Sequence, residues 1–248
     1  MKMEYKVHDI DWTDEKVKRF WDFYNNNAAL EGTWFSKMVG RGIIAFVEKF
    51  FKIEGKILDY GIGKGHFSGY LLENERLEVA ACDFSQETVN NVNAQFRDKP
   101  NFKGCFLVQG FPSTFKDGEF DTVFLIEAIE HLTDDYLLPT IAEANRILKP
   151  GGKFVVTTPN EENLDQNKII CPDCGGIFHR VQHVRSFSGQ SVSQIINKYG
   201  FETVFCGATD FAQYEGGKLL KKLKNTLLKF LKKTYKPPHL VYIGKKAN

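Results

Sequence analysis

Three glycines occupy alternate positions in the stretch DYGIGKG, residues 59–65, directly after a short apolar run. Glycine weakens regular helices and strands, so this spacing indicates that a ligand comes close to the backbone. A dinucleotide site has the pattern Gly-x-Gly-x-x-Gly, whose turn and helix N-terminus receive a pyrophosphate. Here Asp59 precedes Gly61, Gly63 and Gly65, and its carboxylate would repel a pyrophosphate. We therefore expect a ligand that carries a cation, such as an amino group or a sulfonium.

A second group of residues has the spacing of metal ligands. Cys171, Cys174, His179 and His183 form the pattern C-x2-C-x4-H-x3-H. Cysteines at this spacing, followed by glycine, can present both thiolates to one ion, and two imidazoles complete a tetrahedral zinc site. We predict that these four residues bind zinc. The alternative is a polar loop in which the cysteines are incidental.

Short apolar runs alternate with helix-length amphipathic segments along most of the chain. This alternation predicts a Rossmann-like α/β fold, with a seven-stranded, mostly parallel sheet and helices on both faces. The expected strands cover residues 56–60, 77–82, 102–108, 122–126, 154–158, 201–207 and 239–244, the last antiparallel at the sheet edge. Ligands of such sheets bind at the carboxyl ends of the strands, where the glycine-rich turn lies.

Other segments are expected to surround this sheet. Residues 1–50 are predicted to form an N-terminal helical cap, interrupted at residues 25–27 and at Gly40 and Gly42, and residues 51–248 the main domain. Residues 159–185 are expected to be an irregular Cys/His insert after the fifth strand. Residues 217–234 are predicted to form a basic amphipathic helix, because leucines recur near helical spacing among eight lysines between Lys218 and Lys236.

Composition narrows the class of protein. The chain has 248 residues, of which 42% are hydrophobic, and a formal net charge of +2, which is typical of a soluble, core-forming protein. No stretch has the apolar length of a membrane span, and residues 1–16 lack the apolar core of a signal peptide. Five cysteines, an odd number, fit a reduced cytoplasmic protein. For the basic helix three interpretations stay open: a surface helix, a peripheral contact with the inner membrane face, and a contact with nucleic acid.

Five segments, taken in order, resemble the class I S-adenosylmethionine-dependent methyltransferases over roughly residues 50–210: ILDYGIGKG, VAACDFS, LVQGFPSTFKDGEFDTV, FLIEAIEHL and LKPGGKFVVTTPN. The resemblance implies that S-adenosylmethionine binds at the glycine-rich turn. It implies that Asp83 receives both ribose hydroxyls, that Phe84 lies against the adenine, and that Gln109 contacts the adenine amino group. The family often has Asp where Gln109 stands, and the Gln carbonyl can accept the same hydrogen bond.

The segment FLIEAIEHL places Glu127, Glu130 and His131 at the end of the fourth expected strand, beside the expected sulfonium. Some small-RNA 2′-O-methyltransferases hold a divalent ion with a similar Glu-x-x-Glu-His segment and a later histidine, for which His183 is the candidate. The same segment occurs across the superfamily without a metal, where Glu130 begins a helix and His131 pairs with it. We assign catalytic roles to Glu127 and His131, with His131 as the base.

These observations predict a methyltransferase that acts on a small-molecule or lipid-linked acceptor, at a hydroxyl group. S-adenosylmethionine is the expected cofactor, with zinc in addition if the Cys/His insert binds it. One alternative is an RNA 2′-O-methyltransferase that uses an ion bound by the two glutamates and histidine. Another is a non-catalytic protein that keeps the cofactor pocket.

Overall fold

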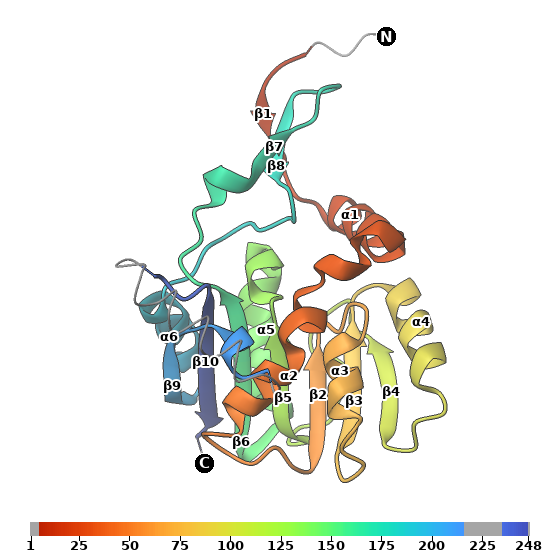
Figure 1. Ribbon diagram of the computed structural model, residues 1–248, viewed down its shortest axis with the longest axis vertical. Helices are drawn as coiled ribbons and strands as arrows, with labels where there is room; N and C mark the ends of the chain where they lie inside the picture. The colour runs from red at the N-terminus through yellow and green to blue at the C-terminus, as the bar shows by residue number, and fades with distance from the viewer. Residues whose placement is uncertain (1–4, 216–234, 248) are drawn as a thin grey trace.

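The computed structural model describes residues 5–215 and 235–247. Its centre is a seven-stranded sheet in the order β4-β3-β2-β5-β6-β10-β9, in which only β10 runs antiparallel to its neighbours (Figure 1). The strands are β2 (Lys56–Tyr60), β3 (Glu78–Asp83), β4 (Phe102–Leu107), β5 (Phe120–Ile126), β6 (Leu148–Pro159), β9 (Phe201–Thr209) and β10 (His239–Lys246). The predicted Rossmann-like sheet is confirmed.

The last strand, β10, has the predicted direction but not the predicted place. It lies between β6 and β9, so the prediction of an edge strand is wrong. The reason is visible in the two sequences. β10 contains the run Leu240–Ile243, whose side chains are buried, whereas β9 exposes much of its length and forms the edge. A strand that is buried on both faces reads as a continuous apolar run.

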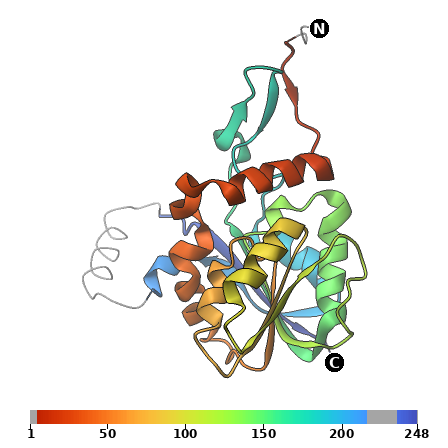
Figure 2. The same cartoon turned by 90° about the vertical axis from the view of Figure 1, so that its right-hand side faces the viewer.

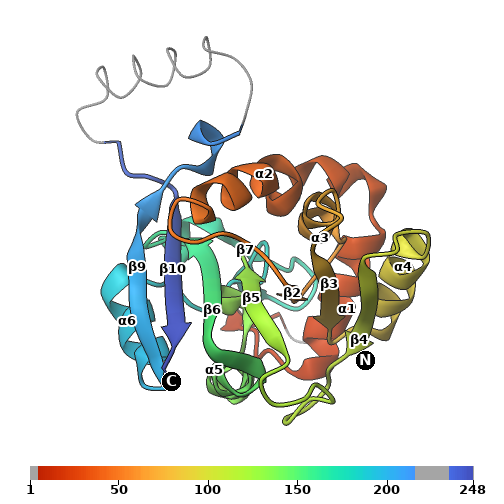
Figure 3. The ribbon, with the colours of Figure 1, turned by 90° about the horizontal axis from the view of Figure 1, so that it is seen from below.

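Helices cover both faces of this sheet (Figure 3). On one face lie α2 (Phe35–Val47), α3 (His66–Leu71) and α4 (Gln86–Phe96), which share a hydrophobic cluster with the sheet. On the other face, α5 (Asp134–Ile147) and α6 (Gly189–Asn197) pack in a second cluster. The sheet is therefore the middle of three layers, and its carboxyl-end edge stays available for a site.

The N-terminal segment is helical as predicted, and its first break lies at Asn27, between α1 (Asp14–Asn26) and η1 (Ala28–Thr33). The second predicted break is wrong, because α2 continues through Gly40 and Gly42. Both glycines permit close packing instead. A Cβ atom on Gly40 would lie 2.6 Å from the Tyr70 ring, and one on Gly42 would lie 2.3 Å from the Phe211 carbonyl oxygen. α2 thus packs into the core of the main domain.

The insert after β6 is ordered into strands, so the prediction of an irregular segment is wrong. β7 (Lys168–Ile170) and β8 (Gly176–His179) form an antiparallel hairpin, and β1 (His8–Asp9) pairs with β8 in parallel. This small sheet stands above the carboxyl end of the main sheet, next to α1, in both side views (Figures 1 and 2). Strands of two to four residues have too little periodicity to be recognised, and β1 comes from a distant part of the chain.

The predicted basic helix, residues 217–234, lies outside the described residues. Among the helices that are described, none is long and apolar enough to cross a lipid bilayer.

Replacing Gly42 with alanine should destabilise the protein, because the new methyl group meets backbone rather than a movable side chain. We expect a loss of about 1–3 kcal/mol of unfolding free energy for Gly42→Ala, the usual cost of overpacking. Gly32→Ala is the matched control, since nothing lies within 4 Å of the added atom. Thermal and urea unfolding measure both; equal stability of the two variants would contradict this packing.

Candidate active site

The glycine-rich turn follows β2 and is held against the end of β3. The amides of Gly61 and Ile62 both donate to the Cys82 carbonyl oxygen, at 2.9 and 3.1 Å. Gly61, Gly63 and Gly65 have φ angles of +77°, +52° and +76°. Residues other than glycine rarely adopt this backbone conformation. Gly61 and Gly63 line the cavity above the sheet, whereas Gly65 caps α3 and faces Phe96 of α4.

Two buried carboxylates flank this turn. Asp83, at the end of β3, accepts hydrogen bonds from the Gly63 amide at 3.2 Å and the Ser85 amide at 3.0 Å. Asp59, at the centre of the sheet edge, accepts one from the Ser68 hydroxyl at 2.7 Å. Burial raises the pKa of each carboxyl group to about 6. A cationic ligand in the cavity would favour the charged form of both.

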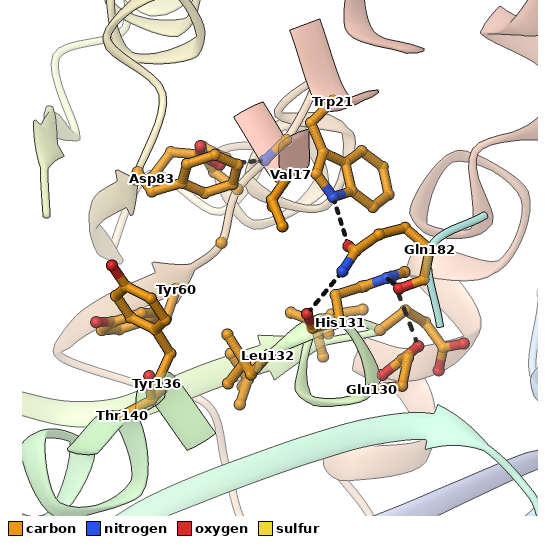
Figure 4. Close-up of a pocket in the computed structure, with 18 of the residues that line it drawn as sticks. Val17, Trp21, Tyr60, Asp83, Glu130, His131, Leu132, Tyr136, Thr140 and Gln182 are labelled. Carbon is orange, nitrogen blue, oxygen red and sulfur yellow. Dashed lines mark hydrogen bonds and ion pairs between the residues drawn. The ribbon is translucent and has the colours of Figure 1, made fainter. Parts of the chain in front are cut away.

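One cavity of about 690 Å³ connects these acids with the end of β5. Phe84 and Gln109, the predicted adenine neighbours, line it together with Asp59, Asp83 and Glu127. Side chains of α1, including Val17 and Trp21, form its roof, and the apolar side chains of Leu132 and Tyr136 face them across the opening (Figure 4). The volume is in the usual range for sites that enclose small molecules.

Glu127 and Glu130 follow β5 at the far end of the cavity. Glu127 has a φ angle of +47°, which is unusual for a residue with a side chain and indicates strain held by its surroundings. Glu130 belongs to η2 (Ile129–His131) and is 1% exposed. Burial, with the charge of Glu130 as a second cause, raises the pKa of Glu127 well above its usual range, and burial raises that of Glu130 to about 8.

His131 is tied to the roof of the cavity through Gln182, which lies near the end of the insert. The Trp21 indole donates to Gln182 Oε1 at 2.9 Å, and Gln182 Nε2 donates to the His131 carbonyl oxygen at 3.0 Å (Figure 4). The His131 imidazole lies 4.8 Å from the Trp21 ring, centroid to centroid. Burial lowers the pKa of His131 to about 3, so the imidazole is neutral at neutral pH. Its role as the base stays a prediction.

Two histidines of the insert, His179 and His183, lie near Glu130 at the same end of the cavity. His183 Nε2 lies 3.9 Å from Glu130 Oε1, and His183 Nδ1 forms a hydrogen bond with Glu162. The ring of His179 stacks on that of His183 with 4.4 Å between centroids, and its Nε2 lies 3.2 Å from Glu162 Oε1. Sequence analysis missed Gln182 and Glu162, because neither belongs to a recognisable motif and both act through contacts with distant segments.

The structure does not bring the four predicted zinc ligands together. Cys171 and Cys174 lie at the turn between β7 and β8, where hydrogen bonds from the backbone amides of Cys174 and Asp173 and from the Cys174 thiol lower the pKa of Cys171. His179 is the last residue of β8 and His183 follows that strand, at the base of the hairpin. Among the described residues, the clusters with metal-ligand spacing are Glu130, His131 and His183, and Glu162, His179 and His183; neither includes a cysteine.

Residues 35–204 match the family described as a methyltransferase domain, and this match covers more than half of the chain. The chain belongs to the class I S-adenosylmethionine-dependent methyltransferases. The carboxylates of Asp59 and Asp83 and the positive-φ turn lie in one cavity, which is where the family resemblance leads us to expect the cofactor. The resemblance that the sequence motifs indicate is confirmed.

Named relatives support the same family. A probable S-adenosylmethionine-dependent methyltransferase of Mycolicibacterium smegmatis is 26% identical over 157 residues, which cover 61% of this chain and 56% of the relative. The malonyl-[acyl-carrier protein] O-methyltransferase of Methylococcus capsulatus is 26% identical over 185 residues, which cover 73% of this chain and 62% of that relative. The methyltransferase thus spans less than two thirds of the length of these curated relatives.

Solved structures show the same fold. The 1,6-didemethyltoxoflavin-N1-methyltransferase of Burkholderia thailandensis, solved with that acceptor and S-adenosylhomocysteine, superposes with a TM-score of 0.67 at 14% identity. The superposition covers 98% of this methyltransferase and 95% of that chain. A putative methyltransferase from Haloferax volcanii, in complex with the Trm112 activator, gives a TM-score of 0.65 at 15% identity, covering 92% and 98%.

Affinity for S-adenosylmethionine should fall as the pH is lowered from 7 to 5. The carboxyl groups of Asp59 and Asp83 have pKa values of about 6, so each takes up a proton below that pH. The cationic cofactor binds the charged form, and binding must then release those protons. We expect up to about a tenfold loss of affinity per pH unit for each proton released. Calorimetric titration at several pH values measures it.

Asp83→Asn should weaken cofactor binding at pH 7.5 by about tenfold or more, because hydrogen bonds to a charged group are strong. Its remaining pH dependence should be shallower than that of the wild type. Asp98→Asn is the matched control, since the Asp98 side chain is 89% exposed. An Asp83→Asn protein that binds the cofactor as tightly as the wild type would exclude the assigned role.

Proposed function

We propose that this methyltransferase transfers a methyl group to a hydroxyl of a small-molecule or lipid-linked acceptor. The observation that carries the proposal is the wall formed by Glu127, Glu130 and His131 in the same cavity as the cofactor acids. A hydroxyl acceptor must lose a proton as its oxygen attacks, and this wall supplies groups that can take or direct that proton. The neutral imidazole of His131 adds no positive charge that would oppose the approach of a sulfonium.

The surface of the cavity fits an acceptor with an apolar part. The apolar and aromatic side chains that line it include those of Val17, Trp21, Phe111, Leu132 and Tyr136. These side chains bury an aliphatic or aromatic body and leave polar selection to the Glu/His wall. A lipid-linked acceptor would place its reacting hydroxyl inside the cavity and its chain toward the roof.

The charge at the opening does not favour RNA. Asp14 and Glu15, in the first turn of α1, line the cavity, and Lys18 is the basic residue beside them. Asp22 pairs with that lysine at 2.5 Å. A polyanion needs several free cations along its path, so these acids favour a small acceptor over an RNA end.

In the proposed reaction the acceptor oxygen attacks the methyl carbon in line with the carbon–sulfur bond. The new C–O bond forms as the C–S bond breaks, and the electron pair of that bond stays on sulfur. The hydroxyl proton leaves toward the Glu/His wall, and the products are a methyl ether and S-adenosylhomocysteine. The cofactor supplies the activation, so the protein mainly orients the two reactants.

The test is formation of S-adenosylhomocysteine with a panel of acceptors: catechols, prenylated phenols, sugars, primary amines and a short RNA duplex. We expect methyl ethers, identified by mass spectrometry, from one hydroxyl class. His131→Ala should lower the turnover rate by about a hundredfold or more while the cofactor affinity stays near that of the wild type. His8→Ala, at an exposed histidine of β1, is the matched control.

Three outcomes would contradict the proposal. Methylation of an amine in place of every hydroxyl would show a different acceptor class. Methylation of the RNA, with a steep dependence on salt, would support the nucleic-acid alternative. Cofactor binding without turnover on any acceptor would support a non-catalytic protein.

A further inference from the structure

We propose that Glu130, His131 and His183 form a binding site for a divalent first-row transition metal ion, such as Zn²⁺ or Mn²⁺, in the wall of the acceptor cavity. One ligand atom from each residue lies within 4.8 Å of the other two, and all three residues line the cavity. The site itself is independent of the acceptor; its role in the reaction rests on the proposed function.

Hydrogen bonds fix the lone pair of His131. Its Nδ1 lies 3.3 Å from the carbonyl oxygen of Gln182, which can only accept a hydrogen bond. In the neutral ring Nδ1 therefore carries the hydrogen, and Nε2 carries the lone pair. That Nε2 atom is 4.0 Å from Glu130 Oε1. Figure 4 shows the imidazole and the Glu130 carboxylate at the same end of the cavity.

A relay of three side chains fixes His183 in the same way. The amides of Val181 and His183 both donate to His179 Nδ1, at 3.4 and 3.2 Å, so the hydrogen of His179 is on Nε2. His183 Nδ1 donates to the Glu162 carboxylate, and His179 Nε2 lies 3.2 Å from Glu162 Oε1. This leaves the His183 Nε2 lone pair directed toward Glu130. A carboxylate behind a histidine is the usual support for a metal ligand.

Glu130 brings a buried carboxyl group to the same point. Its side chain is 1% exposed, and neither of its oxygens has a hydrogen-bond partner among the described residues. Two imidazole lone pairs and an unpartnered carboxyl group therefore converge on one place. A buried carboxylate with no partner is costly, and proteins usually pair it or bind a metal there. A cation at this point satisfies all three groups at once.

The distances fit an ion of this class. Nitrogen and oxygen ligands lie about 2.0–2.2 Å from zinc, so two ligands are about 3–4 Å apart across the ion. The Glu130–His131 and Glu130–His183 separations of 4.0 and 3.9 Å need only a small closure. Two imidazoles and one carboxylate suit a first-row transition metal better than Ca²⁺ or Mg²⁺, which prefer oxygen ligands.

Such a site leaves coordination positions open toward the cavity. An acceptor hydroxyl bound there would have a lowered pKa, so its proton is released to solvent before or during attack on the methyl group. His131 would then act as a ligand rather than as the predicted base.

The test is titration of the metal-stripped, full-length protein with Co²⁺, Zn²⁺ and Mn²⁺, followed by calorimetry and, for Co²⁺, by visible absorption. We expect one ion per chain and cobalt bands without the sulfur charge-transfer absorption of a thiolate site. Glu130→Gln and His183→Gln should each weaken binding by about a hundredfold or more, and Glu162→Gln by about ten- to a hundredfold, the usual effect of a supporting residue. Circular dichroism checks that the variants fold.

Cys171→Ser/Cys174→Ser is the matched control, since these thiols lie at the far end of the hairpin; it should bind the ion as the wild type does. Loss of binding in that variant, or binding unchanged in both Glu130→Gln and His183→Gln, would overturn the site. No binding of any of the three ions by the wild type would overturn it as well. Binding at the predicted residues with turnover unaffected by chelation would keep the site and remove its role in the reaction.

Discussion

The hydrogen bond from the Gly63 amide to Asp83 joins the turn after β2 to the end of β3, and the expected cofactor site is built around this contact. It requires a backbone at positive φ and a carboxylate at the last residue of β3. Desolvation of Asp83 and Asp59 is the cost of this arrangement, and both carboxyl groups have a raised pKa as a result. A cationic cofactor compensates that cost, which links the shape of the turn to the chemistry of its ligand.

The acceptor end is organised by a different set of contacts. Gln182 joins α1, η2 and the insert, because it accepts from Trp21 and donates to the His131 backbone. Its side chain is fully buried, and its φ angle of +60° again marks a constrained position. The N-terminal helix α1 and the insert are therefore coupled to the wall that contains Glu130 and His131.

The parts of the fold that could be predicted from sequence are those encoded by local patterns. The run Lys56–Tyr60 followed by alternating glycines identified β2, its turn and the acid that ends the strand. Asp83 and Glu127 were assigned through the family resemblance of their segments, and both lie at the carboxyl ends of strands as that resemblance implied. The family assignment followed from the order of these pieces.

The remainder depends on contacts between distant segments. The place of β10 is decided by which strand buries both faces, and the three-residue β7 gives no periodic signal. The spacing of Cys171, Cys174, His179 and His183 suggested one site, but a β-strand separates the cysteines from the histidines. An extended strand advances about 3.3 Å per residue, which moves the two pairs apart. His183 instead meets Glu130, a partner 53 positions earlier in the chain.

A crystal structure of the protein with S-adenosylhomocysteine tests the cofactor site most directly. We expect the ribose hydroxyls to contact the Asp83 carboxylate and the sulfur atom to point along the cavity toward Glu127 and His131. A ligand bound elsewhere, or one whose sulfur faces away from that wall, would contradict this expectation.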